Sequence, residues 1–294
     1  MKSWSRRRAR ARATPRLKPL AYYRAVDLYA RARAARSPDR APDAREGVRI
    51  LAYHRVADEP DVLAVRPAVF RAHMELLLAS GATPIRLDAA VDLLARPVRG
   101  RWVCVTFDDG YRDSLELAAP ILRELGIPAT VFLATAIVDG RAGFDWYRRS
   151  PPPALSWDDV HDLVADGLID VQSHSRTHPR LPVLGDEEVL QELAGSKADL
   201  ERHVPGAVST FCYPAGLYGA REARLVLDAG YRAAVTCRPG LNVGDGPLAE
   251  LRRTMIGWAD DPERFRRRLD GATDVPGGLT ELMQRRRAGG RAPV

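Results

Sequence analysis

Two adjacent carboxylates, Asp108 and Asp109, directly follow an apolar segment, residues 102–107, and precede Gly110. The apolar segment is typical of a β-strand. Asp-Gly pairs often form turns, so the motif by itself indicates only that the strand ends here. Neighbouring carboxylates at a strand end can, however, point in different directions, so that one binds a cation while the other accepts a proton.

Two histidines, His174 and His178, follow a second strand-like segment, residues 168–173. Two imidazoles four residues apart can reach one ion if the backbone between them turns. An isolated histidine pair is more often a surface or core feature. Two imidazoles and one carboxylate leave coordination positions open for water and substrate, which is typical of a catalytic rather than a structural metal site.

A third strand-like segment, residues 209–213, ends at Pro214 and Gly216. These two residues interrupt regular structure, and a backbone N–H at such a turn can face a ligand. Taken alone, this is a weak indication, because many strands end in this way.

The segments that would position these residues alternate between strand-like and helical patterns. The predicted strands are residues 48–54, 83–87, 102–107, 129–135, 168–173, 209–213, 232–237 and 252–256. The predicted helices are residues 67–80, 112–125, 156–165, 186–203, 221–229 and 262–269. About eight such units predict an α/β fold, a distorted (β/α)7-8 barrel, with its chemistry at the carboxyl ends of the strands.

Together, the three motifs resemble those of the polysaccharide deacetylases of the NodB-homology group, also called carbohydrate esterase family four. Residues 106–110 are similar to the first motif of this family, and residues 174–178 to the second. Residues 211–216 resemble the third motif in its Phe-x-Tyr-Pro-x-Gly variety. That variety, with Tyr-His-Arg at residues 53–55, is similar to bacterial surface-glycan deacetylases such as those acting on poly-N-acetylglucosamine. The resemblance spans residues 48–270.

The resemblance implies metal-dependent hydrolysis of acetyl groups on a carbohydrate, an N-acetylhexosamine-containing glycan or glycan precursor. Asp109, His174 and His178 would hold a divalent metal ion, for which the family commonly uses Zn²⁺ although other divalent ions serve. Asp108 would be the catalytic base. The backbone N–H of Tyr213 would help to hold the oxyanion.

The general acid is the catalytic group that this resemblance does not supply. Many relatives take it from a Leu-x-His segment near the C-terminus, but no histidine follows His203 in this chain. His54 ends the first predicted strand, so a barrel would bring it to the same rim. We therefore expect His54 to act as the acid or, alternatively, to support the other site residues.

Aromatic residues near the second motif are candidates for a substrate wall. Trp146 and Trp157 flank three prolines, residues 151–153. We expect these two tryptophans, together with Tyr213 and Pro214, to line the substrate site. Simple packing in the core is the alternative for the tryptophans.

The basic charge of the chain is concentrated at its N-terminal end. The first 46 residues hold 14 basic and 4 acidic side chains, a net charge of +10, whereas the whole chain carries +7. The overall composition, with 46% hydrophobic and 28% charged residues, is that of a globular protein. We therefore expect a basic arm over residues 1–46, a single barrel domain over residues 47–275 and a flexible basic tail over residues 276–294.

Besides the carbohydrate substrate that the resemblance implies, the basic arm could bind an anionic partner. We expect it to be solvated, with peripheral contact of residues 1–36 with an anionic membrane as the alternative. Specific nucleic-acid binding is not expected, because the barrel shows no recognition motif. No apolar segment of transmembrane or secretory-signal type is visible, so the expected location is the cytoplasm or the inner membrane face.

Two other functions stay open. The same fold could hydrolyse carbohydrate O-acetyl esters or a cyclic amide, because the substrate is chosen by the loops. The chain could also be a catalytically impaired glycan-binding or scaffold protein, which the missing C-terminal histidine would favour.

Overall fold

The computed structural model describes residues 46–147, 150–272 and 274. The predicted tail and the predicted arm, apart from residue 46, lie outside these residues, so the arm's membrane contact stays a prediction. Within the described part of the chain, no helix is both long and apolar enough to span a membrane.

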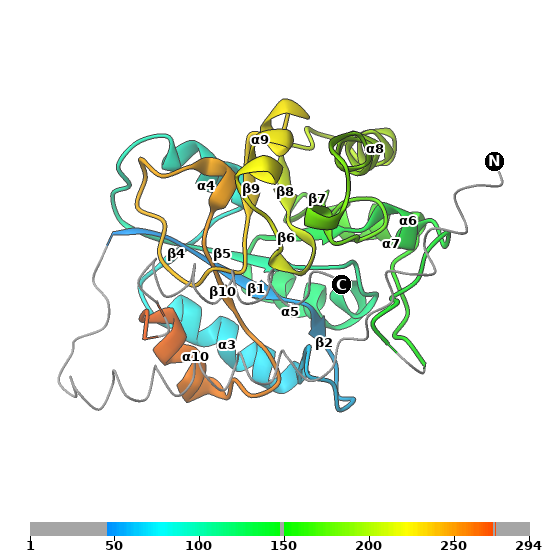
Figure 1. Cartoon of the computed structure of the whole chain (residues 1–294). Coiled ribbons are helices and arrows are strands. Elements are labelled where there is room, and N and C mark those ends of the chain that lie inside the picture. The colour runs from blue at the N-terminus through cyan, green and yellow to red at the C-terminus, as the bar shows by residue number, and fades with distance from the viewer. Residues whose placement is uncertain (1–45, 148–149, 273, 275–294) are drawn as a thin grey trace, which may run out of the picture.

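The described residues form an eight-stranded parallel sheet that curves into a nearly closed barrel (Figure 1). Along its main path, the strands are β10 (Arg253–Met255), β1 (Gly47–Tyr53), β5 (Arg101–Phe107), β6 (Ala129–Leu133), β7 (Ile169–Ser173), β8 (Thr210–Cys212) and β9 (Ala233–Val235). Off this path, β4 (Thr83–Pro84) pairs with β5. A parallel bridge between Val235 and Leu251 brings the two ends of the sheet together. The predicted α/β barrel is therefore confirmed.

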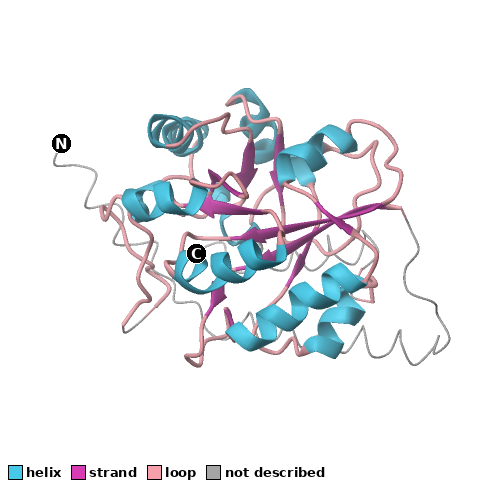
Figure 2. Ribbon diagram, turned by 180° about the vertical axis from the view of Figure 1, so that it is seen from behind, coloured by secondary structure: helices cyan, strands magenta, loops and turns pink. Residues whose placement is uncertain are grey.

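Helices surround the strands, as the two opposite views show (Figure 1, Figure 2). They are α3 (Pro67–Ala79), α4 (Leu87–Leu94), α5 (Ala119–Leu125), α6 (Thr135–Val138), α7 (Trp157–Val164), α8 (Asp186–His203), α9 (Ala220–Asp228) and α10 (Pro262–Leu269). A π-helical turn, Ser114–Ala118, precedes α5, and a short separate ladder joins β2 (Arg55–Val56) to β3 (Ala64–Val65). The sequence predicted the bounds of α8 and α10 correctly.

The prediction of a strand over residues 83–87 is wrong. The strand is only two residues long, and Leu87 already begins helix α4. Leu87, Ala90, Val91 and Leu94 are buried at helical spacing. They pack among inward-facing strand residues such as Val48, so the helix fills the end of the barrel at which the strands begin. The polar motifs lie at the other end of the barrel, where the strands finish.

His73 couples the stability of the fold to pH. Its Nε2 donates to the carbonyl oxygen of Asp260 at 2.9 Å, so its Nδ1 accepts from the hydroxyl of Tyr53 at 3.2 Å. The ring also stacks on Phe265. Burial lowers the pKa of His73 from 6.5 to about 4, so the neutral form is the one held in the fold.

As the pH falls, the unfolded chain therefore takes up the proton of His73 before the folded chain does. The free energy of unfolding should fall by about 3 kcal/mol between the unfolded-state and folded-state pKa values. Urea unfolding at neutral pH and near pH 4 measures this loss. The loss should be smaller in His73→Gln, and an equal loss in both proteins would contradict the assignment.

Candidate metal centre

The three sequence motifs meet at one end of the barrel. Asp108 and Asp109 follow β5, His174 follows β7, and Tyr213 follows β8. Because these strands are parallel members of one sheet, their carboxyl ends share one rim. The structure therefore places the motifs where the sequence predicted them.

Asp109, His174 and His178 converge within this rim. Each offers one ligand atom, and the three atoms lie within 4.8 Å of one another. Asp109 Oδ1 is 3.2 Å from Nε2 of His174 and 3.5 Å from Nε2 of His178. Two imidazole nitrogens and one carboxylate oxygen suit a zinc-like divalent cation, so the donor set fits the metal ion that the resemblance implies.

Unusual backbone conformations bring these side chains together. Asp109, Ser175 and His178 have φ values of 77°, 66° and 54°, in the left-handed region that residues other than glycine seldom adopt. The hydroxyl of Ser175 accepts a hydrogen bond from the backbone N–H of His178 at 3.0 Å, which closes the turn between the histidines. Strained residues of this kind cluster at functional sites, where surrounding contacts hold them.

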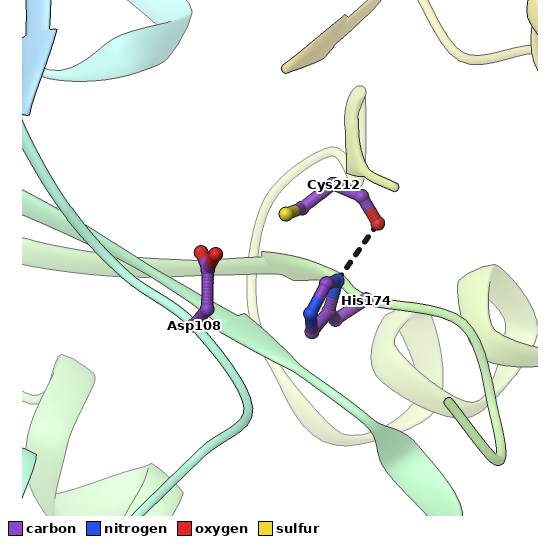
Figure 3. A group of neighbouring side chains, drawn as sticks. All are labelled: Asp108, His174 and Cys212. Atoms are coloured by element: carbon purple, nitrogen blue, oxygen red, sulfur yellow. Dashed lines mark hydrogen bonds between the residues drawn. The ribbon is translucent and has the colours of Figure 1, made fainter. Parts of the chain in front are cut away.

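Hydrogen bonds and burial set the orientation and charge of the three candidate ligands. Nδ1 of His174 donates to the carbonyl oxygen of Cys212 at 2.7 Å (Figure 3), which turns Nε2 toward Asp109. Burial alone would lower the pKa of His174, but the hydrogen bond with Asp109 and the charges of Asp108 and Asp109 raise it. Burial lowers the pKa of His178 to about 4, so its ring is neutral at neutral pH. Burial alone would raise the pKa of Asp109, but the hydrogen bond with His174 and the nearby imidazoles of His178 and His54 lower it.

Asp108 is held in a buried ion pair with Arg253. Nη1 and Nη2 of Arg253 each donate to a different oxygen of Asp108 at 2.7 Å, and its Nε donates to the carbonyl oxygen of Thr236 at 2.9 Å. Burial alone would raise the pKa of Asp108, but the guanidinium outweighs it and holds that pKa well below its usual range, with smaller contributions from His174 and His54. Asp108 is therefore ionised and turned toward Arg253.

Arg253 is a site residue that the motifs did not predict. It lies within the last predicted strand, and a charged side chain in a buried strand needs an ionised partner. That requirement was a usable signal, but it did not identify Asp108 as the partner.

A second group, Asp108, His174 and Cys212, also lies within ligand distance (Figure 3). It does not suit a metal ion. Both oxygens of Asp108 are bonded to Arg253, whose Nη2 also lies 3.1 Å from Sγ of Cys212. Burial raises the pKa of the Cys212 thiol well above its usual value, so the thiol is not the thiolate that binds metals.

The remaining predicted residues around the third motif are less accessible than we expected. The ring of Tyr213 is buried, and its hydroxyl donates to the carbonyl oxygen of Ala249 at 2.9 Å. The backbone N–H of Tyr213 donates to Val235 at 3.3 Å, and Pro214 is also buried. The Tyr213 ring therefore belongs to the core. His54 follows β1 at the same rim and is half-buried.

The two tryptophans have different surroundings. The ring centroid of Trp146 lies 4.6 Å from that of His178, and its indole N–H donates to the hydroxyl of Tyr111 at 2.9 Å. Trp146 therefore stands beside the histidines. Trp157 instead stacks on His203 with a centroid distance of 4.0 Å and donates its indole N–H to Asp139. For Trp157, the packing alternative is the one that these contacts support.

Known proteins that are similar to this chain are polysaccharide deacetylases. Residues 95–234 match the family model described as polysaccharide deacetylase. The candidate polysaccharide deacetylase YxkH of Bacillus subtilis (strain 168) is 26% identical over 209 residues, which cover 70% of each chain. The matched family region contains both aspartates and both histidines of the rim, whereas Arg253 lies beyond it.

Solved structures show the same fold. BC0361, a polysaccharide deacetylase from Bacillus cereus, has a TM-score of 0.65 and 26% identity, covering 76% of this chain and 69% of that one. IcaB from Ammonifex degensii has a TM-score of 0.66 and 23% identity, covering 78% of this chain and 98% of that one. At this lower identity, the likeness to IcaB concerns the fold alone.

Proposed function

This chain carries a domain of the polysaccharide deacetylase family, and on that premise we propose that it is a metal-dependent N-deacetylase. The substrate would be an N-acetylhexosamine-containing glycan or glycan precursor. The observation that carries the proposal is the convergence of Asp109, His174 and His178 next to the ionised Asp108.

In this proposal, Asp109, His174 and His178 hold the metal ion. Zinc is the ion proposed, because two imidazoles, a carboxylate and an open position form a typical catalytic zinc site. A bound divalent cation polarises the acetyl carbonyl group and makes water a better nucleophile.

Asp108 is proposed as the base that takes the proton of the attacking water. Arg253 holds both of its oxygens, so Asp108 stays ionised and oriented beside the metal ligands. Arg253 is thus a positioning residue. The ion pair makes Asp108 a weaker base. In this proposal, keeping Asp108 ionised and oriented contributes more to proton transfer than a higher proton affinity would.

The backbone N–H of Tyr213 is proposed to stabilise the oxyanion. At 3.3 Å, its hydrogen bond to Val235 is longer than the usual backbone bond. A negatively charged oxygen would compete well for such a donor, because charge-assisted hydrogen bonds are the stronger ones.

His54 is proposed as the acid that protonates the leaving amine. Burial raises the pKa values of Asp108 and Asp109, and His54 is among the groups that lower them, behind their closer partners, so His54 lies near the same rim. His54→Asn should lower turnover about 100-fold, as loss of a general acid does. The bound metal should remain, as measured by elemental analysis, with His203→Asn as the control. Unchanged turnover would exclude His54 as the acid.

Acetate release tests the proposed function. The purified chain should release acetate from N-acetylglucosamine oligomers, lose this activity after chelation and recover it with Zn²⁺. An O-acetylated oligosaccharide run in parallel tests the esterase alternative. Binding of the oligomers without any acetate release, with metal bound, would support the impaired scaffold protein instead.

A further inference from the structure

One face of α8 holds the loop that carries His178, and we propose that this face positions the loop for metal binding. We name the face, formed by Glu192, Gly195, Ser196 and Asp199, the anchor face. These residues recur at the spacing of a single helical face. Helix α8 lies next to β7, which leads into the loop (Figure 1). The inference rests on the proposed function, in which His174 and His178 are metal ligands.

Glu192 fixes the two peptide units before His178. Its Oε2 accepts from the backbone N–H groups of Arg176 and Thr177, both at 2.9 Å. Its Oε1 accepts from the hydroxyl of Thr177 at 2.7 Å. One carboxylate thus receives three hydrogen bonds from two consecutive residues, and bonds to an ionised acceptor are the stronger kind.

Gly195 and Asp199 hold the side chain of Arg176. Asp199 Oδ2 accepts from Nε of Arg176 and from the hydroxyl of Thr135, each at 3.0 Å. A Cβ atom on Gly195 would lie 2.4 Å from Cδ of Arg176, so a larger residue here would displace the Arg176 side chain from its present place. A glycine inside a helix is unfavourable by about 1 kcal/mol relative to alanine, and α8 has one where Arg176 crosses it.

Ser196 holds the other end of the loop. Its hydroxyl lies 2.7 Å from the hydroxyl of Ser173, the residue before His174. The anchor face therefore fixes the chain just before each histidine. Without it, the left-handed residues Ser175 and His178 would lose the contacts that oppose their strain, and His178 would no longer be held toward Asp109.

Zinc affinity and hydrogen exchange test the anchor face. Glu192→Ala should weaken zinc binding, measured by competition with a chromophoric chelator, by roughly 10- to 100-fold. Amide exchange in residues 173–180 of the metal-free variant should accelerate. Glu192→Gln keeps an oxygen that can accept from both N–H groups, so it should restore most of the affinity. Glu201→Ala, at an exposed position of the same helix, is the control.

Gly195→Ala separates positioning from simple loss of stability. Alanine favours the helix, so far-ultraviolet circular dichroism should show undiminished helix while zinc affinity falls. Wild-type zinc affinity in both Glu192→Ala and Gly195→Ala would overturn the proposal. If the wild-type chain binds no zinc, the proposed function fails on its own. In that case, amide hydrogen exchange in residues 173–180 of Glu192→Ala tests by itself whether the anchor face holds the loop. Faster exchange would support this, and unchanged exchange would contradict it.

Discussion

Replacing Asp108 with asparagine is expected to lower turnover by about 10⁴-fold, at the upper end of the range for general bases. The amide cannot accept the proton of water, and it places an uncharged group against the guanidinium of Arg253. Because Asp108 is bonded to Arg253 rather than to the metal ligands, the variant should keep its bound metal.

Asp109→Asn is the matched comparison for Asp108→Asn. Asp109→Asn should lose metal and activity together, whereas Asp108→Asn should lose activity alone. Asp228→Asn, at an exposed position, controls for the loss of one charge. Acetate release and elemental analysis measure the two properties. If Asp108→Asn kept more than about a tenth of wild-type turnover, Asp108 could not be the base.

Replacing Arg253 with methionine is expected to lower the free energy of unfolding by about 3–5 kcal/mol, because it leaves the buried charge of Asp108 without its partner. Both residues are almost fully buried, so bulk solvent cannot fully replace the guanidinium. Urea unfolding measures the loss. The double variant Asp108→Asn with Arg253→Met removes the unpaired charge and should recover part of the stability. If the double variant were no more stable than Arg253→Met, the ion pair would not explain the loss.

The same substitution should change the pH dependence of turnover. In the wild type, Arg253 holds the pKa of Asp108 below its unfolded value. The stabilisation from the pair is therefore present above the unfolded-state pKa and is lost only as the pH falls through the lowered one. Without Arg253, burial raises the pKa of Asp108, so the acidic limb of the kcat/KM profile should move to higher pH. An unmoved limb would show that the titration of Asp108 does not limit the reaction.

The sequence by itself determined most of the local elements, α4 excepted, and the identity of the rim residues. Helix α8 was predicted with its observed bounds because apolar residues recur at helical spacing after a charged first turn. A capping box of Ser156 and Asp159 begins α7, and it too depends only on residues close together in the sequence. The convergence of Asp109 and the two histidines could be predicted because a parallel barrel gathers the carboxyl ends of its strands.

Only the tertiary structure decided which distant side chains became partners. Arg253 meets Asp108 across 145 residues because β1 pairs with both β5 and β10, which brings the last strand to the same rim. The burial of the Tyr213 ring and the stacking of Trp157 on His203 likewise depend on neighbouring elements. Local patterns fix the direction of a side chain along its own strand or helix. Its partner depends on how the whole sheet closes, which is set by packing summed over the barrel.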